Sequence, residues 1–224
     1  MRQLFSGSNP ELVLFDLDGT LVDSVPDLAQ AIDRMLSTLG KPEAGVDKVR
    51  TWVGNGAAVL VERAITDEMY PSDIDPDEFE KAYALFLDYY AQATADQSVL
   101  YPGVEQCLQS LQQQSIRMGV VTNKPIRFTD TMLEGFGLSG YFDVVLGGDS
   151  LPQKKPEPEP LLEAMKRCGV EPESTLMVGD SKSDVGAARA AGCPVVCVPY
   201  GYNHGQDIAD SNPDLIVETL SDLT

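Results

Sequence analysis

The feature that most constrains this chain is the alternation of short apolar runs with segments of helical periodicity. Apolar residues recur at intervals of roughly 3.6 positions within residues 104–111, 160–168 and 185–191. Alternation of this kind is typical of parallel βαβ units, in which helices cover both faces of one sheet. The chain is therefore predicted to be an α/β protein with a parallel sheet. The predicted strands are residues 12–15, 118–122, 144–146, 175–178, 195–198 and 215–217.

One stretch breaks this alternation. From about residue 26 to residue 97 the pattern is helical, with no convincing strand, and residues 27–39 and 79–93 are amphipathic. A helical block of this length exceeds an ordinary connection between two strands. We therefore predict a helical cap domain at residues 25–97, inserted into a core made of residues 1–24 and 98–224.

Net charge and hydropathy exclude several classes of partner. The net charge is −19, from 35 acidic and 16 basic residues, and no Lys/Arg-rich run is present, which argues against nucleic-acid binding. No apolar run approaches the length of a membrane span, and the N-terminus lacks a secretory signal pattern. We expect a cytoplasmic protein, a monomer or a homodimer, that acts on a small molecule. Its four cysteines are predicted to be reduced and buried: Cys107, Cys168, Cys193 and Cys197.

Two aspartates follow the first predicted strand, in the sequence Asp16-Leu17-Asp18-Gly19-Thr20. Ligands bind beyond the carboxyl ends of the strands in an open parallel sheet, which is where this segment would lie. Two neighbouring carboxylates resist being ionised together unless a cation offsets them. The pair suits a metal site in which one acid is a nucleophile and the other exchanges protons. The alternative is an ordinary Asp-Gly turn with solvated acids.

Three more polar clusters follow later strands. Thr122 and Asn123 end the second core strand, where a hydroxyl and an amide can hold phosphoryl oxygens. Lys155 follows the third strand, and its ammonium can neutralise a bound phosphoryl group. Asp180 and Asp184 are four residues apart, so both can face one cation if a helix begins between them. Taken singly, each cluster is also compatible with a turn, a solvated charge or a helix start.

In this order, DxDGT, TN, KP and GDSxxD resemble the four motifs of the haloacid dehalogenase superfamily of phosphatases. The resemblance covers essentially the whole core, and the helical insertion after the first motif is similar to that superfamily's cap. It implies a Rossmann-like doubly wound parallel sheet with an all-helical cap that acts as a mobile lid.

The resemblance also implies roles for individual residues. Asp16 matches the nucleophile that forms an aspartyl-phosphate, and Asp18 matches the general acid and base. Thr122 and Asn123 match the pair that positions the phosphoryl group, and Lys155 matches the lysine that steadies nucleophile and phosphate. The dehalogenases of the superfamily typically lack the second aspartate, so Asp18 favours phosphoryl transfer.

Magnesium is the cofactor that the resemblance implies. By analogy, Mg²⁺ is held by a side-chain oxygen of Asp16, the backbone carbonyl of Asp18 and the carboxylate of Asp180. Asp184 is expected to bind through water or to support the other ligands. A cation and Lys155 would offset the repulsion between a carboxylate nucleophile and a phosphate dianion.

Residues 53–57, 151–156 and 199–203 resemble bacterial phosphoglycolate phosphatases, which implies 2-phosphoglycolate as the substrate. Gly54 and Asn55 are expected to contact substrate, although this segment also suits a turn between cap helices. We interpret Arg50 and Arg63 as solvated and His204 as a surface loop residue. The alternatives are a phosphatase for a sugar phosphate such as N-acetylmuramic acid 6-phosphate, a phosphomutase, and a non-catalytic phosphate-binding module.

Overall fold

A parallel sheet of six strands forms the core of the protein. The computed structural model of the chain describes residues 1–223. The strand order is β5-β4-β1-β6-β7-β8, with all pairs parallel, so the predicted parallel sheet is confirmed. Strands β4 and β5 lie on one side of β1, and the later strands β6, β7 and β8 lie on the other. The strand order therefore reverses at β1, and ligands bind at such a switch point in folds of this kind. The strands are β1 (Leu12–Phe15), β4 (Arg117–Val121), β5 (Val144–Leu146), β6 (Thr175–Gly179), β7 (Val195–Cys197) and β8 (Leu215–Ile216).

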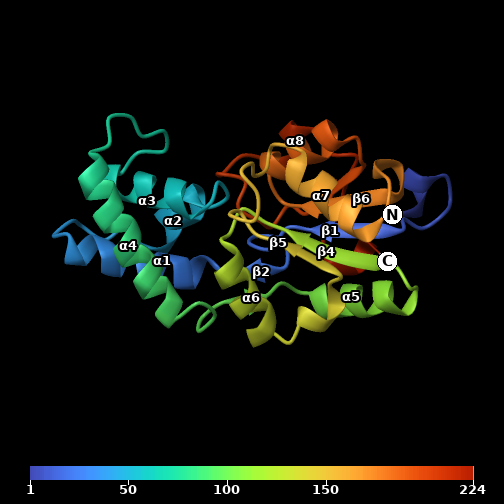
Figure 1. Cartoon of the computed structure of the whole chain (residues 1–224), viewed down its shortest axis with the longest axis horizontal. Helices are drawn as coiled ribbons and strands as arrows, with labels where there is room; N and C mark the ends of the chain where they lie inside the picture. The colour runs from blue at the N-terminus through green and yellow to red at the C-terminus, as the bar shows by residue number, and fades with distance from the viewer. Residues whose placement is uncertain (224) are drawn as a thin grey trace.

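Helices cover both faces of this sheet. Figure 1 shows α5 and α6 on one face and α7 and α8 on the other, and each face has its own cluster of buried apolar side chains. This is the doubly wound arrangement that the sequence predicts. The core helices are α5 (Val104–Gln113), α6 (Ile126–Gly135), α7 (Glu159–Cys168) and α8 (Lys182–Ala191); the short 3₁₀ helices are η1 (Arg2–Phe5), η2 (Ser139–Tyr141), η3 (Pro172–Ser174), η4 (Ile208–Ser211) and η5 (Leu220–Leu223).

Four further helices pack together at one end of the molecule, beyond the carboxyl edge of the sheet (Figure 1). They bury an apolar cluster of their own, which Phe128 and Tyr202 of the core join, so these helices rest on the core. The predicted helical insertion is thus present, and its limits at residues 25 and 97 stay a prediction. The cap helices are α1 (Val25–Thr38), α2 (Val46–Trp52), α3 (Ala57–Thr66) and α4 (Pro76–Gln92).

The chain crosses between core and cap twice, and the two crossings lie side by side. They form a small antiparallel pair, β2 (Val22–Asp23) with β3 (Val99–Leu100), which the sequence analysis does not predict. The buried carboxylate of Asp27 accepts hydrogen bonds from the backbone N–H groups of Gln97 and Ser98 and from the Ser98 hydroxyl. These bonds fasten the start of α1 to the returning strand.

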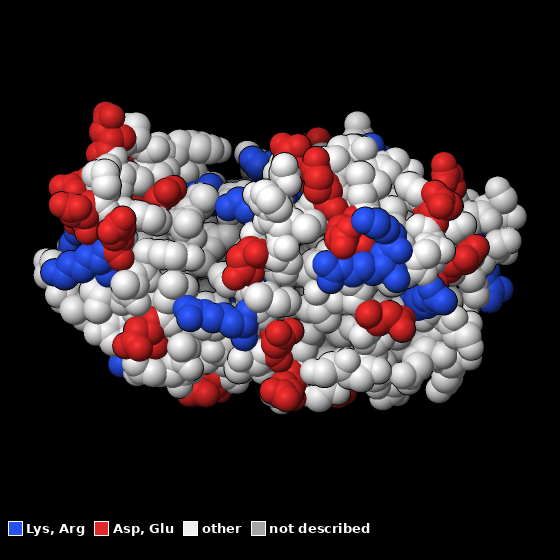
Figure 2. Space-filling view, in the orientation of Figure 1, with Lys and Arg blue, Asp and Glu red and all other residues white. Residues whose placement is uncertain are grey.

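Three expectations about the whole molecule can be compared with the structure. All four cysteines are free and buried, as predicted. Within residues 1–223, no helix combines the length and the apolar character that crossing a membrane requires. Figure 2 shows acidic and basic side chains interspersed over much of one face of the molecule.

Candidate active site

The candidate site lies at the edge of the sheet where β1, β4 and β6 end. Phe15 at the end of β1 pairs with Val120 on one side and with Val178 on the other. The polar residues that follow these strands therefore meet at one edge. They are Asp16, Asp18, Thr122, Asn123 and Asp180.

The segment after β1 turns two carboxylates towards the cap. Leu17 is fully buried in the core, and its neighbours Asp16 and Asp18 both line a cavity between core and cap. Successive side chains of an extended chain point to opposite sides, so burial of Leu17 places the flanking acids together. The backbone N–H of Leu17 donates to Oδ1 of Asp16 at 2.8 Å, which fixes that carboxylate.

Lys155 joins two of the predicted acids. Its Nζ lies 2.9 Å from Oδ1 of Asp16 and 2.7 Å from Oδ1 of Asp184, and its side chain is only 2% exposed. Asp184 lies in the first turn of α8, where its other oxygen accepts bonds from the Ser181 N–H and hydroxyl. The α8 start therefore holds Asp184 in place, and Asp184 holds Lys155 against Asp16.

A group of three acids provides a candidate site for a cation. Carboxylate oxygens of Asp16, Asp180 and Asp184 lie within 4.8 Å of one another. Asp180 is positioned by the hydroxyl of Thr20 at 2.8 Å and the backbone N–H of Tyr202 at 2.7 Å. Hard divalent cations such as Mg²⁺ and Ca²⁺ are bound in proteins by oxygen ligands, many of them from carboxylates.

A glycine makes room for this group. Gly19 has a φ of +90°, and a Cβ there would lie 2.4 Å from Oδ2 of Asp180. Any other residue would be strained and would push Asp180 away. The Gly of the DxDGT segment is thus required by the close approach of Asp180.

The pKa values of these groups reflect burial and crowding. Burial raises the pKa of Asp16 to about 6, with Asp184 adding to the effect and Lys155 opposing it. Burial, followed by the charges of Asp184 and Asp16, raises the pKa of Asp180 well above its ordinary value. Burial lowers the pKa of Lys155, but the negative charges of Asp16 and Asp184 outweigh it, so the net shift is upwards. The nearby positive charge is thus too small to offset the three acids, so the group of Asp16, Asp180 and Asp184 suits a divalent cation.

Thr122 and Asn123 follow β4 and line the same cavity. The amide of Asn123 donates to the backbone carbonyl of Lys155 at 2.9 Å and to that of Gly54 in the cap at 3.1 Å. Its carbonyl oxygen is buried without a hydrogen-bond partner among the described residues. Asn123 therefore connects the Lys155 loop to the cap.

The cavity itself is small and lies between core and cap. Its volume is about 40 Å³. On the cap side its wall is largely apolar, with Leu28, Val53, Leu60 and Phe86 contributing. The polar groups are therefore concentrated on the core side.

Comparison with known proteins places the chain in a family. Residues 13–198 match the family model described as haloacid dehalogenase-like hydrolase. The chain belongs to the haloacid dehalogenase-like hydrolases. The match spans all four motifs and the helical insertion, so the predicted family and fold are confirmed.

Several relatives of this haloacid dehalogenase-like hydrolase carry a more specific name. A Pseudomonas putida protein named phosphoglycolate phosphatase is 51% identical over 99% of this chain and 81% of its own length. A Nitrosococcus oceani protein of the same name is 50% identical over 96% of this chain and 95% of its own. The crystal structure of a predicted phosphoglycolate phosphatase from Haemophilus somnus superimposes with a TM-score of 0.91 at 41% identity, covering 96% and 97% of the two chains.

The structure of this hydrolase brings most of the predicted site residues to one place. Lys155, Asp180 and Asp184 lie behind the cavity, against Asp16, and Asn55 is the exception, because it neither lines the cavity nor contacts these groups. The Asn55 side chain accepts from Arg63 at 2.8 Å, and its backbone carbonyl accepts from Lys154. Gly54 lines the cavity and belongs to the turn between α2 and α3. The segment is therefore a turn between cap helices of which Gly54 faces the cavity, and contact of Gly54 and Asn55 with substrate stays a prediction.

Two interpretations of basic side chains need correction. Arg63 is not solvated: it is 5% exposed and donates to the backbone carbonyls of Trp52 and Met69 as well as to Asn55. His204 is not a simple surface residue either, because its Nδ1 lies 2.9 Å from the backbone carbonyl of Thr51 in the cap. Both side chains support the cap segment that faces the core.

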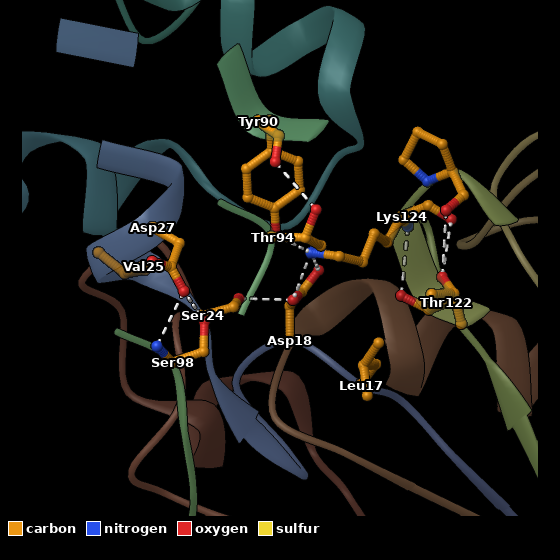
Figure 3. Close-up of polar contacts among 12 residues, drawn as sticks. Leu17, Asp18, Ser24, Val25, Asp27, Tyr90, Thr94, Ser98, Thr122 and Lys124 are labelled. Atoms are coloured by element: carbon orange, nitrogen blue, oxygen red, sulfur yellow. Dashed lines mark hydrogen bonds and ion pairs between the residues drawn. The ribbon is translucent and has the colours of Figure 1, made fainter. Parts of the chain in front are cut away.

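Sequence reasoning missed Lys124 and Tyr90. Lys124 follows Thr122-Asn123 directly, and its Nζ lies 3.0 Å and 3.3 Å from the two oxygens of Asp18. It also donates to the hydroxyl of Tyr90 in α4 at 2.6 Å, as Figure 3 shows. The position of Lys124 directly after the second motif could have marked it as a site residue. The sequence offers no such indication for Tyr90, because an aromatic residue on the apolar face of an amphipathic helix usually belongs to the core.

Proposed function

We propose that this chain is a Mg²⁺-dependent phosphatase that hydrolyses 2-phosphoglycolate to glycolate and phosphate through an aspartyl-phosphate at Asp16. The observation that carries the proposal is the placement of Lys155 between Asp16 and Asp184, beside the Asp180 carboxylate. This arrangement holds a carboxylate ready for nucleophilic attack and surrounds it with groups that offset negative charge.

In the first step, an oxygen of Asp16 attacks phosphorus and the bond to the ester oxygen breaks. Lys155 and the Leu17 N–H both bind Oδ1, and none of the hydrogen bonds among residues 1–223 reaches Oδ2, so one oxygen is oriented and the other is free. Asp18 lies on the same side of the cavity and gives its proton to the leaving alkoxide. Thr122 and Asn123 position the phosphoryl oxygens from the end of β4.

In the second step, Asp18 takes a proton from water, and the resulting hydroxide attacks phosphorus. The bond to Asp16 breaks, which releases phosphate and restores the carboxylate. The cap lies over the cavity, and its closure over substrate would exclude bulk water and so strengthen the electrostatic interactions inside.

Magnesium is part of the proposal because the charges of the site do not balance. Four acids (Asp16, Asp18, Asp180 and Asp184) face two ammonium groups, so at least one negative charge is left before substrate enters, even when Asp18 carries the proton that it gives to the leaving group. Side chains of Asp16 and Asp180 and the backbone carbonyl of Asp18 would hold the ion, with Asp184 behind them. When bound, the ion supplies charge neutralisation for the transferring phosphoryl group.

The choice of 2-phosphoglycolate rests on the relatives named above and on the apolar lining of the cavity on its cap side. The cap wall presents apolar side chains, so the hydroxyls of a sugar phosphate would lose their water without gaining hydrogen bonds. A sugar-phosphate phosphatase and a phosphomutase stay as alternatives, because both use the same core chemistry.

A phosphate-release screen tests the proposal. Purified protein is assayed with 2-phosphoglycolate, N-acetylmuramic acid 6-phosphate and a hexose phosphate, in Mg²⁺ and then in EDTA. We expect 2-phosphoglycolate to have the highest kcat/KM and EDTA to abolish turnover. Equal kcat/KM on all three substrates would contradict the assigned substrate, and turnover that survives EDTA would contradict the metal requirement. Phosphate transfer between sugar positions without phosphate release would identify a mutase.

A further inference from the structure

We infer that Lys124 is the specificity-determining residue of the site and binds a carboxylate that the substrate carries next to its phosphate ester. The inference rests on the proposed function, which it deepens by assigning the second negative group of the substrate to one side chain.

Lys124 is enclosed at the junction of core and cap. Its side chain is 2% exposed, and Figure 3 shows it extended between Asp18 and the Tyr90 hydroxyl. The Tyr90 ring also lies under the ammonium group, 4.8 Å from Nζ to the ring centroid. A lysine held this way by a buried aromatic residue is positioned in advance, so little side-chain entropy is lost when it binds an anion.

Lys124 is the positively charged group available to bind the carboxylate of the substrate, its second anionic group after the phosphate. Among the described residues that line the cavity, the charged ones are Asp16, Asp18 and Lys124. Lys155 does not line it and is shared between Asp16 and Asp184. A carboxylate that enters against the apolar cap wall would otherwise be buried without a partner, which is strongly unfavourable.

The distances suit a carboxylate two bonds beyond the ester oxygen. Asp18 must come within about 2.6–3.2 Å of the ester oxygen to protonate it. Lys124 Nζ lies 3.0 Å from Oδ1 of Asp18. In a glycolate ester, a carboxylate oxygen lies about 3 Å from the ester oxygen, given ordinary bond lengths. A substrate whose ester oxygen contacts Asp18 therefore brings its carboxylate to Lys124, which keeps one contact with Asp18 and transfers another to the substrate.

The test compares two enzymes on two substrates. The enzymes are the wild type and Lys124→Met, which removes the charge and keeps the length of the side chain; the substrates are 2-phosphoglycolate and its neutral amide analogue. We expect Lys124→Met to lower kcat/KM for 2-phosphoglycolate by about 10- to 100-fold, mainly by raising KM. A decrease of this size is typical of the loss of one hydrogen bond to a charged group. Lys124 also contacts Asp18, so Lys124→Met should lower kcat/KM for the amide as well. The decrease for 2-phosphoglycolate should be about tenfold larger than that for the amide, so that the loss of the Lys124 charge and the loss of the substrate charge are strongly coupled.

Controls separate the possible failures. Lys166→Met removes one positive charge at a side chain that is 82% exposed, and it should leave both kcat/KM values unchanged. If Lys124→Met lowers kcat/KM equally for both substrates, Lys124 acts on the chemistry and the inference is wrong. If the wild type prefers 2-phosphoglycolate and Lys124→Met keeps that preference, the carboxylate binds elsewhere, for example at the first N–H groups of α3, and the inference is again wrong. If the wild type hydrolyses 2-phosphoglycolate and the amide equally well, no group recognises the carboxylate and the inference is wrong, whereas a wild type that does not hydrolyse 2-phosphoglycolate contradicts the proposed function itself.

A second substitution guards against misfolding of Lys124→Met. Lys124→Arg keeps the charge but changes its shape, so it should retain more of the preference for the charged substrate than Lys124→Met does. Equal loss of preference in both variants, with melting temperatures like that of the wild type, would count against a role for the charge.

Discussion

The Nζ of Lys155 lies 2.9 Å from Oδ1 of Asp16, and this ion pair is almost completely enclosed. The same ammonium group contacts Asp184, so one positive charge serves two carboxylates. A lysine in this place is positioned to stabilise both the folded protein and the charged form of Asp16, the proposed nucleophile. The two effects can be measured separately.

Replacement of Lys155 by Met should destabilise the protein and reduce activity. Removing one partner leaves Asp16 and Asp184 buried without compensation, which costs about 3–5 kcal/mol of the free energy of unfolding. Urea unfolding measures the loss, and Mg²⁺ should restore part of it because a cation replaces the missing charge. Lys166→Met is the matched control and should change stability by less than about 0.5 kcal/mol. Equal stability of the two variants would show that the buried ion pair is unimportant.

Replacement of Asp16 by Asn should abolish turnover while leaving the fold intact. The amide has the shape of the carboxylate but is a poor nucleophile, so kcat should fall on the order of 10⁴-fold or more. Phosphate release measures activity, and circular dichroism with thermal unfolding reports the fold. Substantial turnover by a well-folded Asp16→Asn protein would exclude covalent catalysis at this residue.

The stabilising effect of Mg²⁺ should grow with pH. Burial raises the pKa of Asp16 from 3.8 to about 6, so between these values the metal-free folded protein binds a proton that the unfolded chain has lost. This group therefore makes the metal-free protein less stable as pH rises through that window. Below about pH 6 a cation must displace that proton, so the increase in melting temperature on adding Mg²⁺ should be smaller near pH 5 than near pH 7. In Asp16→Asn the part of this difference that comes from Asp16 should disappear, while the part that comes from Asp180, whose pKa is also raised, should remain. An increase independent of pH in the wild type would refute the prediction.

Replacement of Asp27 by Asn should loosen the connection between core and cap. The Asp27 carboxylate accepts hydrogen bonds from two backbone N–H groups and a hydroxyl. In Asp27→Asn an amide NH₂ group would replace one accepting oxygen and would face these hydrogen-bond donors. We expect a loss of about 1–3 kcal/mol in the free energy of unfolding. Cleavage by a protease between residues 23 and 98 should also become faster. Asp96→Asn makes the same charge change at an exposed position and should show neither effect.

The sequence was sufficient to predict the sheet and most of the residues that gather at the candidate site. Apolar strands are short and well separated, and the carboxyl ends of parallel strands meet at one edge, so Asp16, Thr122 and Asp180 could be brought together without coordinates. Lys155 could be added only through the resemblance, because its loop does not reveal where the side chain points.

Other contacts could not be predicted, for physical reasons. The ion pair of Lys124 with Asp18 joins residues 106 positions apart, and its second contact depends on how the cap closes. Arg63 is buried because backbone carbonyls satisfy its guanidinium, and such acceptors leave no trace in a residue pattern. The strands β2 and β3 are two residues long each, too short to show any periodicity.

The paired crossings of β2 and β3 also bear on how such a protein can diversify. Since Val22 faces Leu100 across the pair, the cap enters and leaves the core at adjacent backbone positions, about 5 Å apart as in any antiparallel ladder. Any helical module whose own ends lie that close can take the place of residues 25–97 without disturbing the sheet behind it. One hydrolytic core can therefore be combined with different caps, and new substrates can be acquired by exchange or gradual change of the insertion while the nucleophile and its neighbours stay as they are.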